Sequence, residues 1–318
     1  MPDPKTLART TMLSAQYAAA NPDAVAIHDR FGTTSFARLH ADANRLANLF
    51  AKRGLRPGDG VALICGNRAE FVIALLAAFR SGIRLTPVNW HLTAPEVAYI
   101  AQDSRAQLLI VDDGLVPGLD AVLSDIDRIA IADCPNGLAD VLAPFPPELT
   151  FDATEGSVML YTSGTTGRPK GVTRDSHLPV FPQHAGTFAN YDPDRDLALC
   201  CGPAYHAAPL LFDIRWPLAS GVPIVMLPGW DARAVLRAIE RHRVTHLHLV
   251  PAMFGWLLDL PVDERAAFDL RSLRVIVHGA APCPIPVKRA MIDWLGPILL
   301  EYYGASETGT GIQIDSAD

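Results

Sequence analysis

An eleven-residue stretch from Tyr161 to Gly171 constrains this chain more than any other feature of its sequence. It reads Tyr-Thr-Ser-Gly-Thr-Thr-Gly-Arg-Pro-Lys-Gly, with three glycines, four serine or threonine hydroxyls and one lysine. Glycine lets a backbone turn sharply and aim its N–H groups at phosphate oxygens, while hydroxyls and an ammonium group add further donors. This composition predicts a loop that binds a polyphosphate.

The place of this stretch in the chain supports the same interpretation. The apolar run 157–161 before it predicts a strand, and open α/β sheets bind ligands at the carboxyl ends of their strands. The Walker pattern requires Gly-Lys-Ser/Thr, whereas Lys170 follows Pro169 and precedes Gly171, so the stretch is not a Walker loop. Composition alone leaves open a surface turn without a ligand.

Short apolar runs alternate with amphipathic segments from residue 60 onward, which is typical of parallel sheets covered by helices. The expected strands are 60–65, 83–88, 107–111, 157–161, 197–201, 222–227, 246–250, 273–278 and 298–302. The expected helices are 35–53, 68–80, 93–104, 208–219, 231–242, a short one from 252, and 286–295. A chain of 318 residues exceeds the usual size of one core. We therefore predict an α/β fold with two doubly wound subdomains.

Charge and composition exclude several classes of protein. The formal charge of −7 and the absence of a basic stripe argue against a nucleic-acid partner. The five cysteines form no C-x-x-C pair, so the sequence predicts neither a disulfide framework nor a zinc site, and a reducing cytoplasm fits best. The first residues lack the pattern of a signal peptide, and the longest apolar run, 71–79, is too short for a membrane span. We expect a cytoplasmic protein with no integral membrane segment.

The stretch 161–171 resembles, at all its positions, the phosphate loop of the adenylate-forming superfamily, which contains acyl-CoA synthetases, peptide-synthetase adenylation domains and luciferases. A second segment, Tyr303-Gly-Ala-Ser-Glu307, resembles the family's aromatic-Gly-x-Thr/Ser-Glu motif. The resemblance implies that 1–318 is part of an AMP-binding N-terminal domain. Its first subdomain would span about 60–187, and its second about 6–55 plus 195–318.

The resemblance also implies the residues of a nucleotide site. The ligands would be ATP or AMP with Mg²⁺, and coenzyme A would enter in a second half-reaction. The implied nucleotide-binding residues are Thr162, Ser163, Gly164, Thr165, Thr166, Gly167, Lys170, Gly279, Ala280, Ala281, Tyr303, Gly304, Ser306 and Glu307. Thr166 and Glu307 would hold Mg²⁺. Lys170, His206 and Glu307 would be catalytic.

Two of these assignments have simpler alternatives in the residues themselves. His206 ends the segment Pro203-Ala-Tyr-His206, which resembles the family segment beside the carboxylate that is activated, yet a lone histidine before an apolar helix is also a common packing residue. Tyr303 is placed by the resemblance against adenine, because an aromatic face stacks on a base. A buried aromatic residue before a turn is its alternative.

The residues directly after His206 indicate the class of substrate. Peptide-synthetase adenylation domains place an aspartate there to pair with the ammonium group of an amino acid, whereas this chain has Ala207-Ala-Pro-Leu-Leu211, and Asp213 falls late. An unpaired ammonium in an apolar pocket would be costly. A simple carboxylic acid with an apolar tail, fatty or otherwise, is therefore favoured, and the resemblance is closest to acyl-CoA synthetases.

The chain stops at Asp318, shortly after Glu307. Family members continue with a small barrel, a hinge and a C-terminal domain that carries a catalytic lysine. We therefore expect this polypeptide to bind ligands with little turnover. Two alternatives remain open: a degenerate module that binds ATP or an acyl ligand without chemistry, and the adenylation domain of a peptide synthetase. The oligomeric state is also open, a homodimer included.

Overall fold

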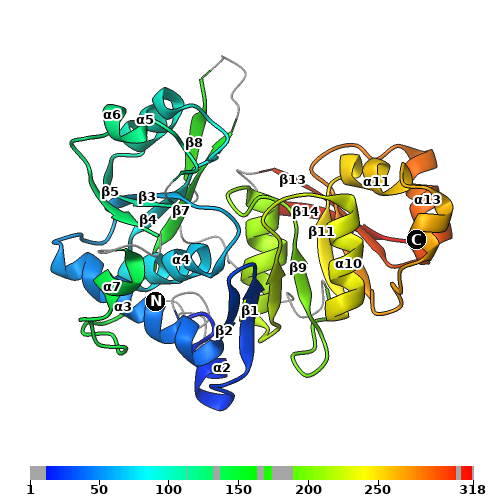
Figure 1. The fold of residues 1–318 in the computed structure, drawn as a ribbon, viewed down its shortest axis with the longest axis horizontal. Helices are drawn as coiled ribbons and strands as arrows, with labels where there is room; N and C mark the ends of the chain where they lie inside the picture. Colours follow the sequence, from blue (N-terminus) through cyan, green and yellow to red (C-terminus); the bar gives the residue numbers. More distant parts are fainter. Residues whose placement is uncertain are drawn as a thin grey trace. The chain divides into compact units, whose positions relative to one another are not determined.

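The chain forms two compact units, each built on its own sheet (Figure 1). The computed structural model describes residues 12–112, 114–131, 137–162, 168–173, 189–305 and 309–316. The first unit comprises Met1–Ala26 and Thr33–Val180, and the second comprises Ile27–Gly32 and Phe181–Asp318. Both sheets are mainly parallel, and the described residues form no closed barrel. The predicted α/β class is therefore confirmed.

The sheet of the first unit has six strands among the described residues, in the order β6-β5-β3-β4-β7-β8. Its strands are β3 (Gly60–Ile64), β4 (Arg84–Pro87), β5 (Ala106–Val111), β6 (Asp127–Ala130), β7 (Ser157–Thr162) and β8 (Lys170–Thr173). Every neighbouring pair is parallel except β7 and β8. Strand β3 is buried along its whole length, which explains its unbroken apolar sequence.

Helices cover this first sheet, and their ends follow local signals. They are α2 (Ala15–Ala20), α3 (Phe36–Lys52), α4 (Ala69–Ser81), α5 (Ala94–Asp103), α6 (Leu119–Val122) and α7 (Leu138–Leu142). Helix α4 is buried at every residue except Glu70. Helix α5 starts with the predicted capping box, in which Glu96 accepts hydrogen bonds from the backbone and side chain of Thr93.

The helix expected at 35–53 packs in the first unit, not with the second unit as the family resemblance implied. Its apolar face lies against α4, and the fully buried Arg80 of α4 connects the two helices. One terminal nitrogen of Arg80 donates to the carbonyl oxygen of His40 (2.9 Å) and to Oδ1 of Asn44 (2.8 Å), both in α3. Burial lowers the pKa of Arg80 to about 9. Because a guanidinium without such acceptors would be costly to bury, these bonds determine where α3 docks.

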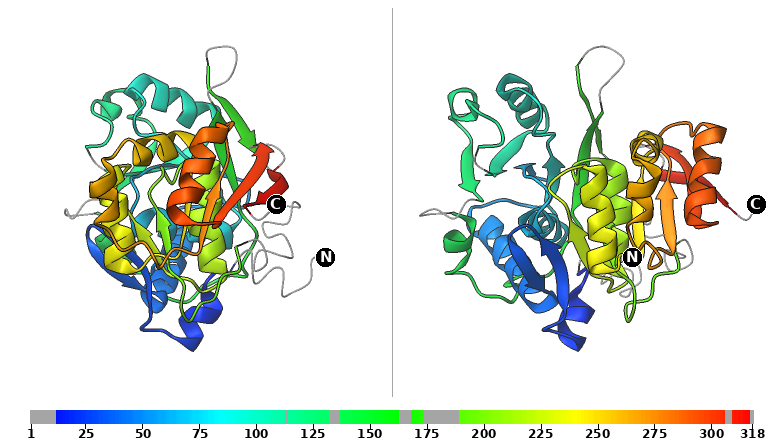
Figure 2. Two further views of the ribbon diagram at one scale, coloured as in Figure 1. Left: turned by 90° about the vertical axis from the view of Figure 1, so that its right-hand side faces the viewer. Right: turned by 45° about the vertical axis from the view of Figure 1, so that its right-hand side comes forward.

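The sheet of the second unit has eight strands among the described residues, in the order β14-β13-β12-β11-β9-β10-β1-β2. They are β1 (Val25–Asp29), β2 (Gly32–Ser35), β9 (Ala198–Cys200), β10 (Ile224–Met226), β11 (His246–Leu249), β12 (Val275–His278), β13 (Leu299–Ala305) and β14 (Gly309–Asp315). The strands from β13 to β1 pair in parallel, whereas β14 pairs antiparallel with β13 (Figure 2, red). Strands β1, β2, β6, β8 and β14 had no counterpart in the sequence prediction.

Two layers of helices enclose this second sheet. The helices are a π-helix η1 (Pro209–Arg215), α9 (Trp216–Ala219), α10 (Ala232–His242), α11 (Pro251–Leu258), α12 (Val262–Ala266) and α13 (Ile285–Leu295). Helices α10, α11 and α13 pack on one face around Leu247, Leu249 and Ile276. Segment η1–α9 packs on the other face around Val277 and Tyr302. No helix in the described part of the chain is long and apolar enough to cross a membrane.

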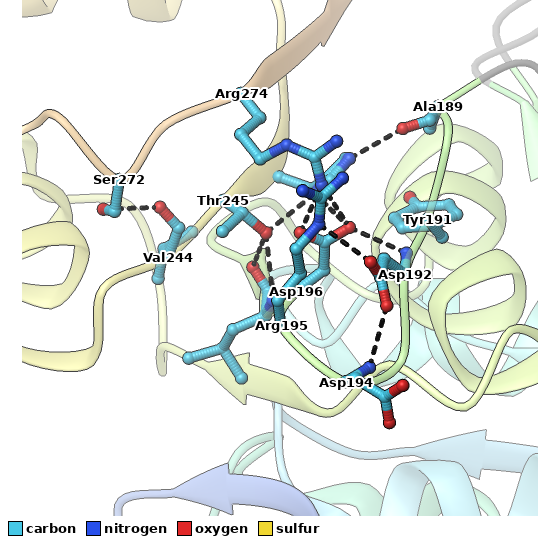
Figure 3. A network of polar contacts seen from close by, with 12 residues as sticks. Ala189, Tyr191, Asp192, Asp194, Arg195, Asp196, Val244, Thr245, Ser272 and Arg274 are labelled. Atoms are coloured by element: carbon cyan, nitrogen blue, oxygen red, sulfur yellow. Dashed lines mark hydrogen bonds and ion pairs between the residues drawn. The ribbon is translucent and has the colours of Figure 1, made fainter.

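A polar network around the ion pair of the enclosed Asp196 with the partly buried Arg274 joins the amino ends of three parallel strands of the second unit (Figure 3). The Asp196 side chain before β9 is fully enclosed, and Nη1 of Arg274, the residue before β12, donates to both of its oxygens at 2.5 and 2.7 Å. The backbone N–H of Asp192 donates to the same carboxylate at 2.8 Å. Before β11, the hydroxyl of Thr245 accepts a hydrogen bond from the Leu197 N–H at 2.9 Å. These contacts set the spacing of β9, β11 and β12 at one end.

Replacing Arg274 by Leu should lower the free energy of unfolding by about 3–5 kcal/mol, because it leaves the enclosed Asp196 carboxylate without its cation. Replacing Arg271 by Leu is the matched control. Arg271 pairs with Asp269 at the surface, where its side chain is 88% exposed, so its loss should change the stability far less than the loss of Arg274. Urea denaturation of both variants checks this difference, and equal losses would contradict it.

Candidate functional site

The strands on either side of the glycine loop form a β-hairpin in the first unit. Strands β7 and β8 pair antiparallel, with Thr162 opposite Lys170. Lys170 therefore begins a strand, although the sequence placed it within the loop, and its side chain is exposed. The predicted residues between them, Ser163, Gly164, Thr165, Thr166 and Gly167, lie outside the described residues.

Helix α5 anchors both strands of this hairpin. The hydroxyl of Tyr161 donates to Oδ2 of Asp103 at 2.6 Å, and the hydroxyl of Tyr99 donates to the carbonyl oxygen of Pro169 at 3.4 Å. The guanidinium of Arg168 lies over the ring of Tyr99, 5.7 Å from its centre. Burial and the Asp103 carboxylate raise the pKa of Tyr161, so its hydroxyl keeps its proton and remains a donor. Thr162 and Lys170 are thus held on a fixed stem.

The predicted adenine segment follows β12 in the second unit, beside β13. Gly279 is buried, and a Cβ there would lie 2.5 Å from the carbonyl oxygen of Tyr302 and 2.6 Å from its ring. Only glycine therefore lets this turn approach β13 so closely. The approach brings the turn from Gly279 to Ala281 next to the strand that carries Tyr303 and Gly304.

Two features of this turn suit a ligand. Ala280 has a φ of 64°, a left-handed conformation that costs an L-residue roughly 1–2 kcal/mol and often marks functional sites. The Tyr303 side chain is 77% exposed, so its ring is not the buried packing residue that composition left open. Ala281 is exposed beside it. The predicted Ser306 and Glu307 lie outside the described residues.

His206 follows β9 at the carboxyl end of the second sheet. It is exposed, and its backbone N–H donates to the Pro203 carbonyl oxygen at 3.0 Å, which closes a turn before η1. The imidazole lies 4.7 Å from the ring of Tyr205, measured between ring centres. Desolvation lowers the pKa of His206, which favours the neutral ring, a group that can donate or accept a hydrogen bond.

The structure also reveals a buried polar group that the sequence analysis set aside. Asp213 of η1 is 1% exposed, and its Oδ1 accepts a hydrogen bond from the backbone N–H of His248 in β11 at 2.9 Å. The ring of His248 lies within hydrogen-bond distance of the Tyr302 hydroxyl, at 3.2 Å. Burial raises the pKa of Asp213 well above its ordinary value and lowers that of His248 to about 3. The sequence signal for this buried group was the presence of one acidic residue, Asp213, in the mainly apolar segment 207–218.

The described residues contain no group of three or more histidine, cysteine or acidic side chains arranged to hold a metal ion. Both residues predicted to hold Mg²⁺, Thr166 and Glu307, lie outside that part of the chain.

The chain belongs to the AMP-binding enzyme family, whose pattern it matches over residues 14–318. The resemblance predicted from the two motifs is thus confirmed. The chain is 30% identical to a feruloyl-CoA synthase from Amycolatopsis sp., over 92% of this chain and 58% of that protein. It is 32% identical to the long-chain-fatty-acid–CoA ligase FadD13 of Mycobacterium tuberculosis, over 79% of this chain and 50% of that protein.

A solved structure of the same fold is that of ATP-bound MatB from Rhodopseudomonas palustris, with a TM-score of 0.80 and 25% identity over 96% of this chain and 63% of that one. The chain spans less than two thirds of the length of these relatives.

Replacing Ala280 by Gly should cost less stability than replacing Ala281 by Gly, by about 1 kcal/mol. Both substitutions raise the conformational entropy of the unfolded chain equally, which lowers the free energy of unfolding by about 0.4–1 kcal/mol. Only the first also removes the backbone strain of an alanine in a left-handed conformation. Thermal denaturation of the two variants measures the difference. Equal losses would mean that the turn is not strained at Ala280.

Proposed function

We propose that this chain is the adenylate-forming part of an acid–CoA ligase. It would activate a carboxylic acid with ATP to an acyl-adenylate, from which coenzyme A takes the acyl group. The family match over residues 14–318 carries this proposal. The Gly279 turn against β13, with the exposed ring of Tyr303 beside it, supports a nucleotide site.

In the proposed reaction, an oxygen of the substrate carboxylate attacks the α-phosphorus of ATP, and the bond to the leaving pyrophosphate breaks. The resemblance assigns the β- and γ-phosphates to the glycine loop and Lys170, and adenine to Gly279 and Tyr303. His206 would orient the carboxylate. Thr166 and Glu307 offer oxygen atoms, which suit Mg²⁺, and the ion would neutralise phosphate charge. Catalysis would thus rest mainly on positioning and charge stabilisation.

The proposed acid has an apolar skeleton. Phe212 and Trp216 of the η1–α9 segment form an apolar cluster with Val277 and Tyr302 on the sheet face below them. The named activities of the two relatives, toward ferulate and long-chain fatty acids, are consistent with such an acid. We also propose a cytoplasmic location, because the five cysteines of the sequence form no C-x-x-C pair and have no regular spacing.

Lys170→Ala and Glu307→Ala should each weaken the binding of ATP·Mg²⁺ to the 318-residue chain by about tenfold or more, because the first removes a charge-assisted contact to phosphate and the second an oxygen ligand of the Mg²⁺ ion. Lys52→Ala, which removes the same charge as Lys170→Ala but from the exposed end of α3, is the control and should bind as the parent does. Calorimetric titration measures all four proteins. Parent-like binding by both site variants would contradict the proposed phosphate site.

Turnover is tested separately from binding. We expect the 318-residue chain to bind ATP·Mg²⁺ and a non-hydrolysable acyl-adenylate analogue, with little release of pyrophosphate in the presence of an acid, because its relatives are considerably longer. Thioester formation by this chain at the rate of a full-length ligase would refute that expectation. Size-exclusion chromatography of the same sample decides whether it is a homodimer.

A further inference from the structure

The order of strands in the second sheet singles out one place for a ligand. From β9 the chain runs through η1 and α9 to β10 on one side, whereas from β11 it runs through α11 and α12 to β12 on the other. Connections that leave neighbouring strands in opposite directions mark the switch point where open α/β sheets bind ligands. In this unit the switch point lies between β9 and β11.

Strands β9 and β11 stop pairing just before this point. Their register runs from Ala198 opposite His246 to Leu199 opposite Leu247, and the next N–H of β11, that of His248, donates to Asp213 instead of to β9. The carboxyl group of Asp213 therefore occupies the position between the two diverging strands. Its place there depends on the π-helix η1, which projects an acidic side chain inward from an apolar segment.

Asp213 keeps one oxygen unused. Its Oδ2 is buried and has no hydrogen-bond partner among the described residues, where Asp213 also forms no ion pair. Because no cation among the described residues forms an ion pair with it, burial raises the pKa of Asp213 and favours the protonated carboxyl. A protonated carboxyl without an acceptor is costly in an apolar environment, so a ligand that supplies one would be favoured.

Uncharged polar groups and aromatic rings surround this carboxyl. His248 is paired with Val277 in the neighbouring strand, so their side chains lie on the same face of the sheet. Tyr302 lies on that face too, because it belongs with Val277 to the cluster beneath η1. The ring of Phe212 stacks on that of His248, with centres 5.3 Å apart, and lies 4.6 Å from that of Tyr302. Burial keeps the His248 ring neutral. The site therefore offers neutral donors and acceptors between apolar walls.

We propose that Asp213, His248 and Tyr302 select an acid substrate that carries a hydroxyl group on its apolar skeleton. This inference rests on the proposed function and narrows its substrate class. A hydroxyl oxygen accepts the hydrogen bond that the protonated carboxyl has to give, and its own proton can be donated in return. A substituent with a positive charge would require an ionised Asp213, and a negative one would be unfavourable, because no cation in the described part of the chain forms an ion pair with Asp213.

The test uses pairs of acids that differ only in the hydroxyl: para-hydroxycinnamate against cinnamate, and ω-hydroxydodecanoate against dodecanoate. Calorimetric titration of the 318-residue chain should show tighter binding of the hydroxylated member, by about tenfold, in at least one pair. The binding of ATP·Mg²⁺ is measured on the same preparation. Normal nucleotide binding with no preference for either hydroxylated acid, or with no acid bound, would overturn the inference and leave the proposed nucleotide site intact.

Substitutions then assign the preference to particular groups. Tyr302→Phe and Asp213→Leu should reduce it to within about twofold, whereas Asp213→Asn should retain it, because an amide still donates and still accepts from the His248 N–H. Tyr191→Phe is the control, since the Tyr191 hydroxyl already donates to the Phe212 carbonyl oxygen at 3.1 Å. If Asp213→Leu does not fold, the preference for the hydroxylated acid measured in Tyr302→Phe and in Asp213→Asn decides whether the inference holds.

Two results would contradict the inference. One is a preference that survives Tyr302→Phe or is lost in Tyr191→Phe, which would place the hydroxyl elsewhere. The other is tightest binding of ω-aminododecanoate, lost in Asp213→Asn, which would make Asp213 an ionised partner of an ammonium group and favour an amino-acid substrate.

Discussion

The enclosed ion pair between Asp196 and Arg274 is the interaction on which the second unit depends. It joins the amino ends of β9 and β12, and the hydroxyl of Thr245 brings in β11. Because that end is fixed, the strands can part at the opposite end without loss of the sheet. Their divergence is what gives Asp213 its position, and the turn at Gly279 emerges at the same end of the sheet.

Regular elements were predictable wherever local sequence and burial agree. Strand β3 and helix α4 are buried along nearly their whole lengths, so unbroken apolar runs identified them, and Thr93 and Glu96 fixed the start of α5. Strands β8 and β14 were missed because each exists through antiparallel pairing with a neighbour. The π-helix contains Asp213, which accepts a hydrogen bond from the distant His248 N–H, and no periodicity in the sequence indicates that contact.

The motifs identified residues of the site but not their environment. Gly279 and Ala280 were chosen because small residues admit a ligand, whereas the contact with Tyr302 and the left-handed backbone needed coordinates. Helix α3 was assigned to the second unit by the family resemblance, because its sequence shows an apolar face but not the partner of that face. That partner depends on Arg80, a cation that sequence reasoning expects at a surface and that the structure buries.

The bond between Asp213 and the His248 N–H links the choice of substrate to the integrity of the sheet. A change at position 213 that admits a different acid must still provide an acceptor for that backbone group, or the strand loses a hydrogen bond inside the core. Asparagine, serine and threonine meet this condition, and aliphatic residues do not. Descendants of this chain could therefore diverge in specificity most readily through Tyr302 and Phe212, whose side chains contact the ring of His248, whereas Asp213 accepts a hydrogen bond from its backbone.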